Sequence, residues 1–235
     1  AQAIGAYERV LEIEETHSET LELLEGLYEE TGDGAALMRI LSARVASTPS
    51  REERVGLLMK KARVAEEELG DLEAARQASE AILALSPGHR ESLEALERFA
   101  GARSDWADME RVLASRLEVS ESREERLRLT LSRARNLLKN LDGADQALQL
   151  AVEADEMARD AQEIVDVVRT LELLLSPGTT QARAAERLAP RYEDAKRWSD
   201  LVDALEVLRR HAITPKEREN LALRSSKLAE GPLGD

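Results

Sequence analysis

Arg51-Glu52-Glu53-Arg54 returns further along the chain as Arg123-Glu124-Glu125-Arg126. At the same shift, Leu69-Gly70-Asp71 returns as Leu141-Asp142-Gly143. A fixed shift that holds without gaps is the signature of a repeat architecture. Arrays of repeats pack each unit against its neighbours and present an extended surface. The sequence therefore predicts a repeat protein whose function lies in a surface.

The third copy of the repeat follows the second at a longer shift. Trp106 corresponds to Trp198, and Glu125-Arg126 corresponds to Glu217-Arg218. The additional residues fall between about 157 and 183 and are enough for one helix and its turn. We expect this one-helix insertion to bend or offset the array locally.

Composition narrows the fold class to an all-α chain. Hydrophobic residues make up 43% of the 235 residues, aromatic residues only 3%, and there are six prolines. The core is therefore expected to consist of Leu, Ala, Val and Ile. These residues recur at helical spacing, and no run of alternating β-branched residues occurs, which favours helices over strands.

Charge and cysteine content exclude several functions. The net charge of −14 would repel nucleic acid, so we expect no nucleic-acid partner. The chain has no cysteine, which excludes disulfides, thiolate catalysis and Cys-ligated metals. No stretch of 18 apolar residues occurs, so we expect no membrane insertion. We expect a soluble protein and favour the cytoplasm, although cysteine content does not fix the compartment.

Apolar periodicity, N-cap residues and prolines divide the chain into about 13 helices. Asp33, Asp71 and Asp105 are expected N-caps, and Thr48-Pro49, Ser86-Pro87 and Ser176-Pro177 are expected helix ends. The helices are expected near 1–14, 19–31, 34–47, 51–69, 72–85, 90–101, 105–118, 123–140, 144–157, 160–175, 180–195, 197–211 and 216–229. Because the connections have two to five residues, neighbouring helices are expected to be antiparallel.

The hairpins resemble tetratricopeptide repeats. One hairpin carries the resemblance in its apolar positions, its turn and its closing proline, namely Leu21, Leu24, Tyr28, Gly32-Asp33, Leu41 and Pro49. The next hairpin does so in Met59, Ala62, Gly70-Asp71, Ala75, Ile82 and Pro87. The resemblance implies a right-handed superhelical α-solenoid of antiparallel helix hairpins, with a 72-residue double-hairpin period, as a single array over 1–235.

The same resemblance implies a partner-binding surface. In proteins similar to this one, the first helix of each hairpin lines the concave face. Transferred to this chain, the inward residues are Glu22, Gly26, Lys60, Val64, Glu94, Arg98, Ser132, Asn136 and Lys139. Asn136 with Lys139 resembles a carboxylate-gripping pair of some family members, whereas Lys60 is followed by Val64 where that pair would have asparagine. The implied function is a non-catalytic scaffold for protein–protein interaction.

Charge alternates between the helices. Long first helices carry recurrent basic residues such as Arg54 and Lys61, and short first helices carry glutamates such as Glu22 and Glu94. Two interpretations remain open: ion pairs between successive helices, or a patterned groove for a charged peptide.

No catalytic, cofactor-binding or metal-binding residues are predicted. Trp106 and Trp198 occupy equivalent positions, which favours packing between helices over ligand stacking. His17 and His89 lie one repeat period apart at equivalent turns, so they are not expected to share a metal. No Ser/His/Asp set and no Gly-rich phosphate loop occurs, and we therefore expect no enzyme activity.

Both ends of the chain fall at the same phase of the repeat. Ala1 corresponds to Glu73, and Leu233-Gly234-Asp235 corresponds to the turn that precedes a second helix. This phase predicts a segment of a longer array. Two alternatives are a structural array that self-associates head to tail through helices 1–14 and 216–229, and an interaction or regulatory domain of a larger multidomain protein.

Overall fold

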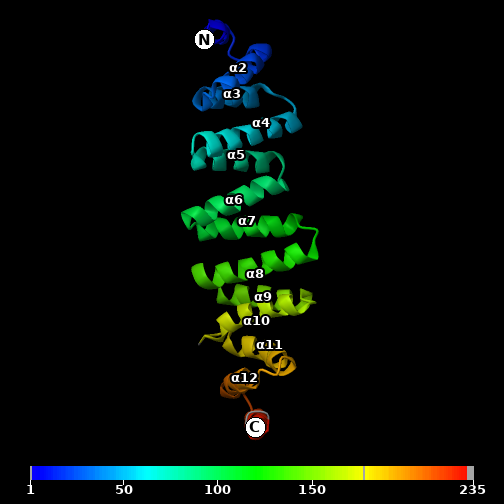
Figure 1. Ribbon diagram of the computed structural model, residues 1–235. Coiled ribbons are helices and arrows are strands. Elements are labelled where there is room, and N and C mark those ends of the chain that lie inside the picture. Colours follow the sequence, from blue (N-terminus) through cyan, green and yellow to red (C-terminus); the bar gives the residue numbers. More distant parts are fainter. Residues whose placement is uncertain (1, 177, 232–235) are drawn as a thin grey trace. The chain divides into compact units, whose positions relative to one another are not determined.

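The computed structural model describes residues 2–176 and 178–231. Within these residues the chain is all-helical, with thirteen α-helices and no strand, which confirms the all-α prediction. Consecutive helices fold back on one another in hairpins (Figure 1). Contacts divide the chain into two compact units, Ala1–Val119 and Ser120–Asp235. Ala1, Pro177 and Leu233-Gly234-Asp235, which entered the sequence predictions, lie outside the described residues.

The first unit holds seven helices. They are α1 (Gln2–Ile13), α2 (Ser18–Thr31), α3 (Gly34–Ser47), α4 (Arg51–Arg63), α5 (Leu72–Leu85), α6 (Arg90–Arg103) and α7 (Trp106–Val119), and a π-helical turn, η1 (Val64–Glu68), continues α4. Each helix in this unit contacts the next along the chain. The expected helix 51–69 thus contains a change of winding at Val64, where the amide of Leu69 bonds to the carbonyl of Val64 at 3.2 Å.

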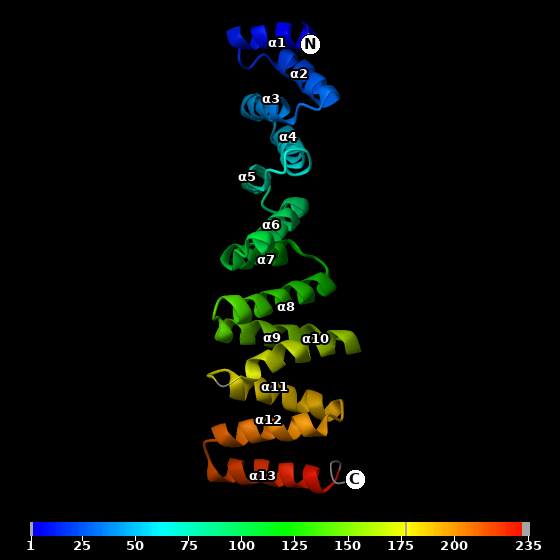
Figure 2. The same cartoon turned by 60° about the vertical axis from the view of Figure 1, so that its left-hand side comes forward.

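The second unit holds six helices. They are α8 (Arg123–Asn140), α9 (Ala144–Met157), α10 (Ala161–Glu172), α11 (Gln181–Asp194), α12 (Trp198–His211) and α13 (Pro215–Glu230), and a 3-10 turn, η2 (Leu173–Leu175), continues α10. Figure 2 shows α11, α12 and α13 as successive antiparallel layers. Helix α10 lies in the region of the expected one-helix insertion and contacts α8, α9 and α11.

Side-chain caps start the helices where the sequence predicts them. The carboxylates of Asp33, Asp71 and Asp105 accept hydrogen bonds from backbone amides three residues later, at 3.0, 2.9 and 3.1 Å. Each bond satisfies an amide that has no partner inside the helix. The N-cap predictions for these three aspartates are confirmed.

Helix ends also follow the expected chemistry. Helix α3 ends at Ser47 before Thr48-Pro49, and α5 ends at Leu85 before Ser86-Pro87, because proline disfavours a helical residue before it. Helix α2 ends instead with a left-handed residue, Gly32, whose φ is +68°. Such turns reverse the chain within two to four residues and keep consecutive helices antiparallel.

The core of each unit is aliphatic, as the composition predicts. In the first unit, Leu21, Leu24, Leu37 and Leu41 are fully buried between α2 and α3. In the second unit, the largest cluster joins α8 to α12 around small and branched residues, including Ala151, Val167, Leu171, Ala185, Leu188 and Leu205. Small residues at these crossings let helices approach closely, so the hairpins act as rigid supports for surface side chains.

Candidate functional site

The first helices of the first unit are joined by ion pairs. The Lys60 ammonium of α4 donates to Glu25 and is also paired with Glu29, both on α2. On the next first helix, α6, the guanidinium of Arg98 donates to Glu66 of η1 at 2.7 Å. Three first helices, α2, α4 and α6, therefore share one charged surface. Ion pairs between successive first helices, one of the two interpretations of the charge pattern, therefore occur here, although Arg98 is a basic residue on a short first helix.

Glu25 is the centre of this surface. Its side chain is only 8% exposed, and it also accepts a hydrogen bond from Arg44 of α3 at 2.5 Å. Burial opposes ionisation of Glu25, but hydrogen bonds from Lys60 and Arg44 outweigh burial and lower its pKa. Burial likewise disfavours the charged Lys60, while Glu25 and Glu29 raise its pKa. The pair stays ionised at neutral pH and holds α2, α3 and α4 together.

The predicted partner-binding residues differ in accessibility. Val64 is 2% exposed and packs in the first unit's core, and Asn136 is 5% exposed and accepts from Asn140 at 2.9 Å. Ser132 is half-buried on α8, whereas Lys139 is exposed near the end of that helix. Of Ser132, Asn136 and Lys139, only Lys139 is exposed.

The remaining predicted residues are exposed but paired. Glu22 accepts from Arg44 at 3.2 Å, and Glu94 accepts from Arg116 of α7 at 3.3 Å. Arg98 is 61% exposed in its ion pair with Glu66. A partner that uses these residues would therefore exchange an exposed intramolecular ion pair for an intermolecular one, which needs little reorganisation.

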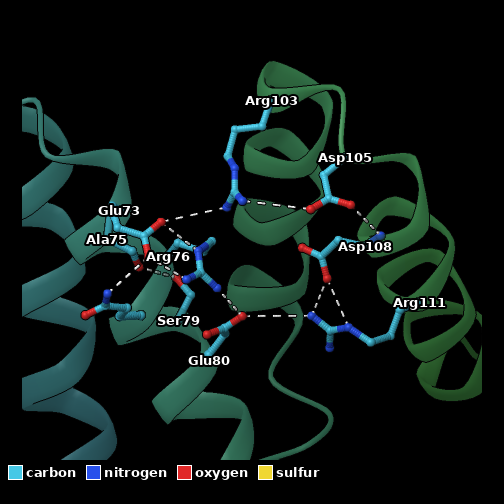
Figure 3. Close-up of polar contacts among 10 residues, drawn as sticks. Glu73, Ala75, Arg76, Ser79, Glu80, Arg103, Asp105, Asp108 and Arg111 are labelled. Atoms are coloured by element: carbon cyan, nitrogen blue, oxygen red, sulfur yellow. Dashed lines mark hydrogen bonds and ion pairs between the residues drawn. The ribbon is translucent and has the colours of Figure 1, made fainter.

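A second charged network lies on α5, α6 and α7 (Figure 3). Arg76 sits between Glu73 and Glu80, with nitrogen–oxygen distances of 2.5 Å to each. The hydrogen bond from Arg76 is the main reason that the pKa of Glu73 falls to about 2. A carboxylate held ionised in this way suits an ion pair and does not suit a general acid.

This network extends to the neighbouring helices. Arg111 of α7 pairs with Asp108 at 2.5 Å and approaches Glu80 at 3.9 Å. Arg103 lies 3.7 Å from Glu73 and 3.8 Å from Asp105 (Figure 3). The network joins three consecutive helices through ion pairs that are open to solvent and therefore contribute little to stability.

His17, His89 and Trp198, which occupy repeat-related positions, cap helices or pack against the core. The Nδ1 atoms of His17 and His89 accept from the amides of Thr20 and Ser92, both at 3.3 Å, so these histidines are N-caps of α2 and α6. Trp198 is half-buried against the second unit's core, in agreement with a packing role. No group of three or more potential metal ligands occurs in residues 2–176 and 178–231.

Sequence reasoning missed a cleft in the second unit. Leu208 and His211 of α12, Glu186 of α11, and Glu217 and Leu221 of α13 line a volume of about 500 Å³. Ile213, in the turn between α12 and α13, lies at its rim and is 88% exposed. Arg44 and Arg116 occupy the same position in the first two copies of the repeat, and Leu208 occupies it in the third. An alignment of the three copies would have shown that the third copy lacks an arginine here.

In comparisons with known proteins, no family model matches this chain and no curated protein matches it. None of the helices in the described part of the chain is both long and apolar enough to cross a membrane.

Proposed function

We propose that the chain is a non-catalytic scaffold for protein–protein interaction, built as a right-handed superhelical solenoid similar to tetratricopeptide repeats, with a 72-residue double-hairpin period. Its partners are extended or helical segments of other proteins, which lie along the first helices. The charge pattern of these helices sets the specificity, because complementary charges favour one partner and exclude like-charged ones.

One observation carries this proposal: ion pairs between successive first helices. Lys60 joins α4 to α2, and Arg98 joins α6 to η1 at the end of α4. Within the second unit, Arg224 of α13 pairs in the same way with Glu193 of α11 at 2.7 Å. First helices that are neighbours form a surface on which a segment can contact several repeats.

The test is a peptide-display selection with the intact chain, followed by affinity measurements on the selected peptides. Arg98→Glu and Lys139→Glu change exposed charges on first helices and are expected to weaken binding at least tenfold. Arg39→Glu is the matched control, because Arg39 is 73% exposed on a second helix, α3. Lys60→Glu is unsuitable, since it would place a third carboxylate beside Glu25 and Glu29.

The proposal fails if no peptide is selected. It also fails if Arg39→Glu weakens binding as much as the two first-helix variants do.

Self-association is a second candidate function, favoured by the exposed apolar residues of α1 and α13. Neither helix has a buried residue, and Ile13 and Leu223 are 89% and 54% exposed. Helix α1 corresponds in the repeat to α5, and α13 corresponds to α4, which packs on α5. Light scattering over a concentration series tests this candidate, and a monomer at every concentration would exclude it.

A further inference from the structure

An arginine in the first unit is held by carboxylates from the helices on either side of it. Arg44 of α3 lies 2.5 Å from Glu25 and 3.2 Å from Glu22, both on α2. It also lies 3.6 Å from Glu53 of α4. Its side chain is 16% exposed, so the guanidinium fills the space between α2, α3 and α4.

The next copy repeats this arrangement. Arg116, one repeat period after Arg44, is paired with Glu97 and lies 3.3 Å from Glu94. These glutamates stand one repeat period after Glu25 and Glu22. An arginine on the second helix that binds carboxylates of the preceding first helix is therefore a recurrent element of the array.

The third copy keeps two of these carboxylates, has Ala189 at the position of Glu97, and lacks the arginine. At the shift that relates Trp106 to Trp198, Arg116 corresponds to Leu208 and Glu94 corresponds to Glu186. The third carboxylate around Arg44, Glu53, corresponds to Glu125 in the second copy and to Glu217 in the third. Glu186, Leu208 and Glu217 line the cleft between α11, α12 and α13. The shorter, uncharged leucine leaves open the region that Arg44 fills in the first copy.

The carboxylates of the cleft have capacity for a ligand. Glu186 makes no hydrogen bond or ion pair with the residues that the structure describes. Glu217 accepts one hydrogen bond, from the amide of Thr214 at 3.1 Å to Oε2. The guanidinium of the neighbouring Arg218 donates to the carbonyl of Ile213 at 3.3 Å.

Part of the cleft wall is apolar, beside the polar His211 and Asn220. Leu208 and Leu221 pack partly on the core of the second unit, and Ile213 extends the apolar wall to the rim. An arginine side chain combines a methylene stem with a planar group that donates to two carboxylates at once. A lysine ammonium matches this pair less well, because it is a point charge and more strongly hydrated.

We propose that the cleft between α11, α12 and α13 binds an arginine side chain of a partner peptide. The guanidinium lies between Glu186 and Glu217, its stem lies on Leu208, and an adjacent apolar side chain of the peptide lies on Ile213 and Leu221. The partner thus supplies the arginine that Arg44 and Arg116 supply within the chain. This inference rests on the proposed scaffold function and identifies one site and the chemistry of its ligand.

The test uses two blocked dipeptides as probes, acetyl-Arg-Leu-amide and its citrulline analogue, which has the same shape without the charge. Methyl NMR of the intact chain follows the signals of Leu208, Ile213 and Leu221 during titration. We expect the arginine probe to shift Ile213 and Leu221 and to bind at least tenfold more tightly than the citrulline probe.

Two variants and a matched control complete the test. Leu208→Arg supplies the missing arginine internally, and Glu186→Gln with Glu217→Gln removes the charge. Both are expected to reduce arginine-probe binding at least tenfold. Asp203→Asn on α12 removes an exposed carboxylate outside the cleft lining and should leave binding unchanged. Circular dichroism checks that each variant is folded.

The inference is overturned if the citrulline probe binds equally well, or if folded Leu208→Arg binds like the wild type. Display-selected peptides separate this failure from failure of the scaffold function. Peptides that bind the wild type and the Glu186→Gln/Glu217→Gln variant equally would retain the scaffold and exclude the cleft. Absence of any selected peptide, together with no shift from the arginine probe, would exclude both.

Discussion

The hydroxyl of Tyr192 on α11 donates to Glu172 on α10 at 3.2 Å. Tyr28 on α2 donates in the same way to Glu8 on α1, at 2.7 Å. Both tyrosines are buried, and each pair spans 20 residues of chain. Helix α10 is therefore fixed to α11 by the same contact that fixes α1 to α2, although the two pairs belong to different units.

The surroundings of the two acceptors differ, so removing the hydroxyl should have unequal effects. Without the tyrosine hydroxyl, Glu172 still has an ion pair with Arg197 at 2.9 Å, whereas Glu8 has a longer ion pair with Arg39 at 3.9 Å. We expect Tyr28→Phe to lower the free energy of unfolding by about 1 kcal/mol and Tyr192→Phe by about half as much. Urea unfolding followed by circular dichroism measures both, and a larger loss for Tyr192→Phe would contradict this account.

The histidine caps of α2 and α6 give a second prediction. Because His17 and His89 accept an amide hydrogen bond through Nδ1, alanine at either position leaves that amide without its cap. We expect His17→Ala and His89→Ala each to lower the free energy of unfolding by about 1 kcal/mol. His17→Asn and His89→Asn restore an acceptor and should recover that loss. If asparagine and alanine have equal effects, the caps do not stabilise the helices.

The two internal arginines should differ in their contribution to stability. Removing Arg44 leaves Glu25, 8% exposed, with Lys60 as its remaining cation. Removing Arg116 leaves Glu97 and Glu94, whose side chains are 29% and 45% exposed and can be hydrated. We expect Arg44→Met to lower the free energy of unfolding by about 2 kcal/mol and Arg116→Met by about 1 kcal/mol. The reverse order in urea unfolding would show that burial of the carboxylate is not decisive.

Acid stability should depend on Glu163 at the start of α10. Its carboxylate accepts from Arg123 of α8 at 2.8 Å, and this bond is the main reason that its pKa falls to about 2. A carboxylate with a lowered folded-state pKa contributes stability above its unfolded pKa of about 4.3, and that contribution is lost as the pH falls toward 2.

Glu163→Gln should therefore flatten the decrease of melting temperature between about pH 5 and pH 2, where the wild-type carboxylate becomes protonated. The glutamine can still accept the cap hydrogen bond, so the variant separates charge from capping. Asp203→Asn is the control and should keep the wild-type slope. Parallel pH profiles for Glu163→Gln and the wild type would rule out this ion pair as a source of acid sensitivity.

The fold was predictable from the sequence where local chemistry determines it. The expected and observed bounds of 34–47, 72–85, 123–140 and 144–157 coincide, because caps and prolines act on neighbouring residues. The change of winding at Val64 was not predicted. Its amides bond five or six residues back, with Asp71 bonding to Ala65 at 2.8 Å, and no residue type specifies this geometry.

The candidate site was less predictable. The resemblance to tetratricopeptide repeats implied that Val64 and Asn136 lie on the concave face, yet both are buried, because burial depends on neighbouring helices that the resemblance does not describe. The cleft at Leu208 lies where the third copy has leucine instead of arginine, and the role of that arginine is visible only in the ion pairs of Arg44 and Arg116. Contacts between consecutive helices, such as Arg116 to Glu94, are set by packing and not by local pattern.

Helix ends with a left-handed residue give the last prediction. Gly32 adopts a φ of +68° after α2, and the equivalent positions after α6 and α11 are Ser104 and Lys196, both with a φ of +54°. A side chain in this conformation is strained by its Cβ atom, whereas glycine adopts it freely. We expect Ser104→Gly and Lys196→Gly each to raise the free energy of unfolding by about 0.5 to 1 kcal/mol, and Gly32→Ala to lower it by about 1 kcal/mol.

Gly56→Ala within α4 is the control for the intrinsic effect of exchanging glycine and alanine. A Cβ atom at Gly56 meets nothing within 4 Å, so this variant should be more stable than the wild type. Urea unfolding of the four variants measures the set, and a loss of stability in Ser104→Gly and Lys196→Gly would mean that their side chains contribute more than the strain they impose.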